Sequence, residues 1–99
     1  MSEQSRFGEV IDALWETIEG RRDADPEDSY TARLLTGHED KLLKKIGEEA
    51  TEVVMASKDA DVDHLRYEAG DLVYHLLVVL ARHGITPDDL AEELAARFK

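Results

Sequence analysis

The chain of 99 residues has no cysteine, two prolines and a single tryptophan. Without cysteine it can form neither a disulfide nor a zinc–thiolate site, so its fold requires no oxidising compartment. No uninterrupted apolar run approaches the ~20 residues of a membrane-spanning helix, and the opening MSEQSRFGEV lacks the basic and apolar regions of a signal peptide. We therefore expect a cytoplasmic protein with no membrane partner.

Positive charge is also scarce, because 12 Lys and Arg residues face 23 Asp and Glu residues, for a net charge of -11. Non-specific binding to nucleic acid depends mainly on neutralising phosphates, so this balance argues against a nucleic-acid partner. A polyanionic small substrate would be repelled overall and would need cations at its site. The length predicts one domain over residues 1–99 with a modest core, which association would help to stabilise.

Apolar residues recur at helical spacing along most of the chain, interrupted by turn and capping signals. The predicted helices cover residues 7–20, 29–35, 38–57 and 62–83, and a last helix begins at Pro87 with Thr86 as its N-cap. The pattern predicts an all-α fold, a helical hairpin bundle of four to five helices completed by homodimerisation. We expect Trp15 to pack in the core and Phe98 to anchor the last helix there.

The stretch from Lys41 to His75 contains two groups of carboxylates on either side of a polar turn centred near Ala60. The groups are Glu48, Glu49 and Glu52 before the turn, and Glu68 and Asp71 after it. Glu52 and Glu68 are each eight residues from Ala60, and Glu49 and Asp71 are each eleven. At about 1.5 Å per residue the inner pair lies roughly 12 Å and the outer pair roughly 16 Å from the turn, so an antiparallel hairpin can bring the carboxylates together.

Such an acidic group has a plain interpretation as a solvent-exposed face, which is what most charge runs are. However, like charges held together without a counter-ion destabilise a fold. A hard divalent cation removes that difficulty, and oxygen ligands in a chain without cysteine favour Mg²⁺, with Mn²⁺ as a substitute. Because Mg²⁺ often completes its shell with substrate phosphates, we expect a phosphate ester as the ligand.

Two strings carry a family resemblance: KKIGEEATEVV at 44–54 and EAGDLVYH at 68–75, with Ser29-Tyr30-Thr31 upstream. They resemble the phosphoribosyl-ATP pyrophosphohydrolases, which act at the second step of histidine biosynthesis, within the all-α, MazG-like nucleoside triphosphate pyrophosphohydrolases. The ExxE and ExxD signatures of that superfamily correspond to 49–52 and 68–71. The resemblance covers nearly the whole chain. One departure from the family pattern is Gly70 in place of Ala, which costs a helix up to about 1 kcal/mol.

The resemblance implies Mg²⁺-dependent hydrolysis of phosphoribosyl-ATP to phosphoribosyl-AMP and pyrophosphate. The candidate metal ligands are Glu48, Glu49, Glu52, Glu68 and Asp71, with Glu48 the one most readily placed outside direct contact. The candidate catalytic residues are Glu49, Glu52 and Lys45, and the candidate substrate-binding residues are Tyr30, Arg33, Lys41, Lys44 and Lys45. We expect His75 to be a hydrogen-bond partner or a core-edge residue rather than a metal ligand.

Two alternatives remain open. A house-cleaning hydrolase of non-canonical or deoxynucleoside triphosphates keeps the chemistry and changes the substrate, and a non-catalytic acidic helical dimer has no chemistry at all. The dimer itself is expected because Leu76 to Ala81 is apolar all round the helix. In an isolated chain this would leave Val78 and Val79 in water, so we expect the segment to form the interface.

Overall fold

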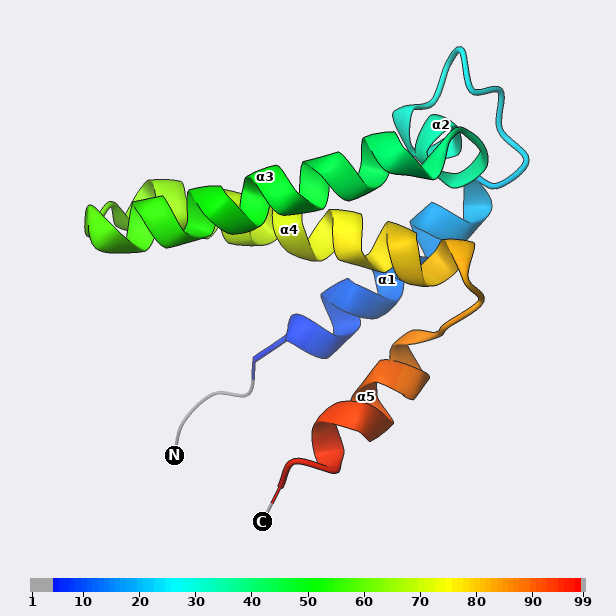
Figure 1. Ribbon diagram of the computed structural model, residues 1–99. Helices are drawn as coiled ribbons and strands as arrows, with labels where there is room; N and C mark the ends of the chain where they lie inside the picture. The colour runs from blue at the N-terminus through cyan, green and yellow to red at the C-terminus, as the bar shows by residue number, and fades with distance from the viewer. Residues whose placement is uncertain (1–4, 99) are drawn as a thin grey trace.

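The computed structural model describes residues 5–98, and within that range the chain folds into five α-helices without a strand (Figure 1). The helices are α1 (Phe7–Gly20), α2 (Tyr30–Thr36), α3 (Glu39–Lys58), α4 (Val62–Arg82) and α5 (Pro87–Ala95). The predicted all-α class is confirmed, and the predicted helices match those observed to within a few residues. None of the described helices is long and apolar enough to cross a membrane.

Local sequence signals explain where several helices begin and end. The Ser29 hydroxyl and the Asp61 carboxylate each accept a backbone N–H at 3.1 Å, capping α2 and α4. Thr86 and Asp89 form a reciprocal capping box at the start of α5. Such a cap contributes about 1 kcal/mol. Gly84, with φ of +70°, follows α4 in the left-handed conformation that often terminates a helix.

Helices α3 and α4 form a long antiparallel hairpin, drawn in green and yellow in Figure 1. Ala60, with φ of 54°, lies in the turn between them, as the spacing of the acids predicted. Figure 1 shows α1 and α2 near the end where α3 begins and α4 finishes, while the turn end projects beyond them. We call residues 39–45 and 73–82 the core end of the hairpin, and residues 46–72 the arm.

The hydrophobic core lies at the core end. Its buried residues are Ile18, Leu34, Leu35, Leu42, Leu77, Val78 and Ala81. Trp15 is half-buried against this cluster, so its expected packing role is confirmed. Within residues 5–98 the cluster includes no residue of the arm, where α3 and α4 pack chiefly on each other.

Two expectations about burial are wrong. Val78 is fully buried in the single chain because α1 and α2 supply Ile18 and Leu34 to the same cluster. Phe98 is 83 % exposed. It follows the end of α5 at Ala95, and because α5 itself buries no residue, it does not direct Phe98 into the core. The all-round apolar segment of α4 is therefore largely covered within one chain.

Arg82 joins α4 to α2 through contacts that the sequence does not suggest. Its Nη1 atom lies within donating distance of the carbonyl oxygens of Leu34 at 2.9 Å, Leu35 at 3.1 Å and Gly37 at 2.8 Å. These carbonyls belong to the last turn of α2 and the residue after it, which a helix leaves without internal partners. Arg82 thus fixes α2 on the core end and sets the position of the residues that α2 carries.

The described fold is more extended than a compact chain of its size. Its radius of gyration is 15.0 Å, whereas about 13 Å is typical for 100 residues. Its accessible surface is 7463 Å² for 11.2 kDa, whereas a compact monomer of that mass exposes roughly 5,700 Å². The arm projects beyond α1 and α2, and α5, which has no buried residue, also lies apart from the hairpin (Figure 1).

Candidate active site

The two carboxylate groups converge on one open groove along the arm, of about 820 Å³. Its charged lining residues are Lys44, Lys45, Glu48, Glu49, Glu52, Glu68 and Asp71. All five predicted metal ligands and two of the predicted lysines therefore share one surface. The hairpin brings them together because residues at equal distances from the turn lie side by side on antiparallel helices.

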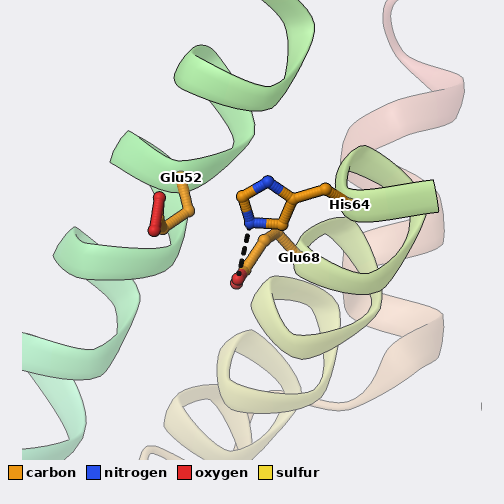
Figure 2. A group of neighbouring side chains, drawn as sticks. All are labelled: Glu52, His64 and Glu68. Carbon is orange, nitrogen blue, oxygen red and sulfur yellow. Dashed lines mark ion pairs between the residues drawn. The ribbon is translucent and has the colours of Figure 1, made fainter. Parts of the chain in front are cut away.

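Two acids of the groove, one from α3 and one from α4, lie beside a histidine of α4 (Figure 2). Glu52, His64 and Glu68 each offer a ligand atom, and these atoms lie within 4.8 Å of one another. His64 Nε2 is 3.3 Å from Glu68 Oε2. The sequence motifs assign no role to His64. The signal was its position four residues before Glu68, which puts both side chains on one helix face.

The donor set suits a hard divalent cation. Carboxylate oxygens are preferred by Mg²⁺ and Mn²⁺, and the groove is open enough to admit a phosphate and water beside them. The imidazole of His64 is a less typical ligand for Mg²⁺ and is paired with Glu68. The assignment of the five acids as metal ligands stays a prediction, and among them Glu52 and Glu68 have ligand atoms within 4.8 Å of each other.

Glu49 differs from the other acids because its carboxylate is buried and fixed. It is 7 % exposed, and its Oε1 atom lies 2.7 Å from Nδ1 of His75, itself 5 % exposed. His75 Nδ1 also lies 3.0 Å from the carbonyl oxygen of Asp71. Because both neighbours are acceptors, Nδ1 carries the proton and donates it. The expectation that His75 is a hydrogen-bond partner is confirmed.

The chain of contacts continues from His75 to α2. The hydroxyl of Tyr30 lies 3.1 Å from His75 Nε2, which in the neutral ring accepts a hydrogen bond from that hydroxyl. Burial raises the pKa of Tyr30 above its ordinary value of 10.0, and the neighbouring Tyr74 and Glu49 raise it further. Tyr30 therefore remains a phenol at neutral pH and can donate. The Thr31 hydroxyl contacts the Tyr74 hydroxyl at 2.5 Å, which gives α2 a second polar contact with α4.

The predicted substrate-binding residues fall into two places. Lys44 and Lys45 line the acidic groove. The others, Tyr30, Arg33 and Lys41, line a separate pocket of about 410 Å³ together with Pro26, Leu34, Thr36, Gly37 and His38. We call this second site the basic pocket. All these residues were predicted to bind substrate at one site, and the structure divides them between two sites.

Comparison with known proteins decides the family. Residues 11–98 match the family model described as phosphoribosyl-ATP pyrophosphohydrolase. The chain belongs to this family. It is 54 % identical over 89 residues to the phosphoribosyl-ATP pyrophosphatase of Pelotomaculum thermopropionicum, covering 90 % of this chain and 91 % of that protein. It is 50 % identical over 88 residues to the Nitrosomonas eutropha protein of the same name, covering 89 % and 75 %.

A further relative places this kind of chain within a longer protein. The histidine biosynthesis bifunctional protein HisIE of Caldanaerobacter subterraneus is 48 % identical over 91 residues, which are 92 % of this chain and 44 % of that protein. The family match includes both carboxylate groups and the α2 residues of the basic pocket. The family resemblance inferred from the sequence is confirmed.

Proposed function

We propose that this protein hydrolyses phosphoribosyl-ATP to phosphoribosyl-AMP and pyrophosphate, the second step of histidine biosynthesis, in a reaction that requires Mg²⁺. One observation carries the proposal: in a chain of this family, five carboxylates and two lysines converge on a single open groove. The reaction breaks the anhydride between the α and β phosphates, so it needs charge neutralisation, an activated water and a stabilised leaving group.

The carboxylates of the groove supply the first two requirements. Glu52 and Glu68, with Glu48, Glu49 and Asp71 around them, would hold Mg²⁺, or Mn²⁺ in its place. When bound, the ion would neutralise phosphate charge and lower the pKa of a water molecule. A carboxylate of the same group, from Glu49 or Glu52, would accept the proton of the attacking water. His75 keeps Glu49 in one orientation through its 2.7 Å hydrogen bond.

The lysines supply the third requirement. Lys44 and Lys45 line the same groove as the acids, where an ammonium group can stabilise the charge that develops on the departing pyrophosphate. Tyr30, Arg33 and Lys41 bind the rest of the nucleotide from the basic pocket. In a chain of net charge -11 these local cations offset the overall repulsion of a polyanionic substrate.

We also propose that the working form is a homodimer joined along the hairpin. The accessible surface of one chain exceeds that of a compact monomer of this mass by roughly 1,800 Å². If each of two chains buries such an area, the total is typical of an obligate interface. Apolar side chains of α3 and α4 contribute to this surface: Val54 is 61 % exposed, Leu43 44 % and Leu76 40 %. The expected interface segment 76–81 thus contributes through Leu76 rather than Val78.

The cytoplasm remains the proposed location, which suits a chain without cysteine. The function is tested by incubating the purified protein with phosphoribosyl-ATP and measuring pyrophosphate and phosphoribosyl-AMP, with and without Mg²⁺. We expect both products in equal amounts, and none after chelation of the metal. Faster turnover of a deoxynucleoside triphosphate would favour a house-cleaning hydrolase. A protein that releases no pyrophosphate from any nucleotide and shows no thermal shift with Mg²⁺ would be a non-catalytic dimer.

A further inference from the structure

The basic pocket differs in charge from the rest of this acidic chain. It is lined by Arg33, Lys41 and His38, and no Asp or Glu occurs among its lining residues in the described range 5–98. Within that range, neither Arg33 nor Lys41 lies within ion-pair distance of a carboxylate. Two cations beside one pocket, with no described acid to neutralise them, indicate an anionic ligand.

The guanidinium of Arg33 is oriented by its neighbours. Its Nη1 atom donates to the carbonyl oxygen of Pro26 at 2.7 Å, and its central carbon lies 5.7 Å from the centre of the Tyr30 ring. These contacts use one of the five N–H donors of the guanidinium, so others remain for a ligand. A planar, oriented fork of donors matches the oxygens of a phosphate group.

The basic pocket lies on the same side of α3 as the acidic groove. Lys41, Lys45 and Glu52 are separated by four and seven residues, which places them on one helix face. Lys41 lines the basic pocket, whereas Lys45 and Glu52 line the groove. From Lys41 to Glu52 the distance along the helix is roughly 16 Å. One extended ligand can therefore occupy both sites.

The two sites are also connected through side chains. Tyr30 lines the basic pocket, its hydroxyl contacts His75 at 3.1 Å, and His75 contacts Glu49 of the groove at 2.7 Å. The wall between the sites is thus built of hydrogen-bonded groups with fixed positions. A ligand that spans the two sites meets a pre-formed surface rather than one that must be ordered on binding.

We propose that the basic pocket binds the phosphate monoester on the second ribose of the substrate, the group that distinguishes phosphoribosyl-ATP from ATP. The inference rests on the proposed function, in which the triphosphate occupies the acidic groove. Arg33 and Lys41 contact the monoester about two to three helical turns away from the acids. The pocket therefore acts as the specificity site that favours the pathway intermediate over ordinary nucleoside triphosphates.

The kinetic test compares two ligands that differ in this monoester. In Arg33→Gln and Lys41→Gln we expect the KM for phosphoribosyl-ATP to rise about ten- to a hundredfold, the loss of one charge-assisted hydrogen bond, with kcat little changed. The inhibition constant of ATP, which lacks the monoester, should stay within about twofold of wild type. Lys58→Gln and Arg66→Gln, at exposed positions away from both sites, are matched controls.

Each other kinetic outcome overturns the inference. If both variants weaken ATP as much as phosphoribosyl-ATP, the pocket binds the triphosphate. If neither variant changes the KM, the two cations do not contact substrate. Thermal melting shows whether each variant is folded, and Arg33→Lys, which keeps the charge but not the fork, should give an intermediate rise in KM.

A binding experiment separates this inference from the proposed function. Ribose 5-phosphate is titrated into the isotope-labelled wild type, and we expect NMR shift changes at Arg33, Gly37 and His38 that are lost in Lys41→Gln. Shift changes confined to the acidic groove, or none at all, would overturn the inference. If ribose 5-phosphate binds the pocket but phosphoribosyl-ATP is not hydrolysed, the proposed function fails and the phosphate site remains.

Discussion

At the core end of the hairpin, α1 and α2 cover α3 and α4 so completely that Leu42 and Val78 are fully buried. In the arm, Val54 is 61 % exposed and the carboxylates of two helices line an open groove. The core end supplies apolar burial, and the arm concentrates like charges that oppose folding unless a cation neutralises them. This small chain therefore separates the source of its stability from the groove proposed for its chemistry.

One series of contacts connects the core end with the groove of the arm. Arg82 fixes α2 on the core end, and α2 carries Tyr30, whose hydroxyl meets His75 and through it Glu49. The core end therefore positions one acid of the groove, while Glu52 and Glu68 depend on the hairpin alone. A functional group held on rigid elements keeps its geometry better than one on a loop.

The largest effect is expected from removing one charge of the arm. Glu52→Gln should lower kcat by about a hundredfold or more, an effect typical of a group that stabilises charge in the transition state. In a chelating buffer its melting temperature should equal or slightly exceed that of wild type, because like-charge repulsion falls. Pyrophosphate release and thermal melting measure both results.

Glu16→Gln, an exposed position on α1, is the matched control for that experiment. Near-normal turnover by Glu52→Gln would remove this residue from the site. Glu49→Gln should also lose turnover, but with a loss of stability, because the Glu49 carboxylate is paired with buried His75.

The next effect contrasts two adjacent leucines at the core end. Leu42 is 0 % exposed and Leu43 is 44 % exposed. Leu42→Ala should lower the free energy of unfolding by about 2–5 kcal/mol, since it leaves a cavity in the core. Leu43→Ala should cost the chain itself less and should weaken association instead. Urea denaturation and light scattering distinguish them, and equal losses of folding stability would disprove the division.

A smaller loss of stability is expected at the junction of α2 and α4. Arg82→Gln leaves three carbonyl oxygens without their common donor and should cost about 2 kcal/mol. Arg97→Gln, which breaks exposed contacts with the carboxylate and the carbonyl oxygen of Glu93, should cost under about 1 kcal/mol. Denaturant unfolding measures both, and similar values for the two would show that Arg82 does not hold α2.

The smallest effect concerns the pH dependence of stability. The pKa of Tyr30 in the folded state is raised above 10.0. The contribution of the protonated Tyr30 side chain to the free energy of unfolding is therefore fully present below the unfolded-state pKa, and it is lost as pH rises through the folded-state pKa. Wild type should therefore lose stability above about pH 10 more steeply than Tyr30→Phe. If the stability of the two proteins fell equally with pH in the alkaline range, folding would not raise the pKa of Tyr30.

The sequence predicted what depends on local signals. Apolar periodicity and caps such as Ser29 and Thr86 located the helices, and counting from Ala60 predicted which acids meet across the hairpin. The burial of Val78 and the exposure of Phe98 were not predictable this way, because they depend on how α1, α2 and α5 pack. The contacts of Arg82 with α2 likewise join residues that are 45 to 48 positions apart.

The division of the acidic and basic sites was also outside the reach of the sequence. Lys41 and Lys45 are one helical turn apart and looked equivalent, yet the structure assigns them to different sites. His64 lies four residues before Glu68 in the sequence, but it joins a possible ligand group only because Glu52 approaches from α3. These features arise where two helices meet, and periodicity within one helix does not report them.

Paramagnetic NMR tests directly whether the arm binds a divalent cation. Mn²⁺ is titrated into methyl-labelled protein, and the broadening of each methyl signal reports its distance from the ion. We expect the methyl of Met55, which lines the groove, to broaden at the lowest Mn²⁺ concentrations, while Ile18 in the core stays sharp. Excess Mg²⁺ should restore the Met55 signal. Broadening that is uniform, or centred on the core end, would show that the cation does not bind at the arm.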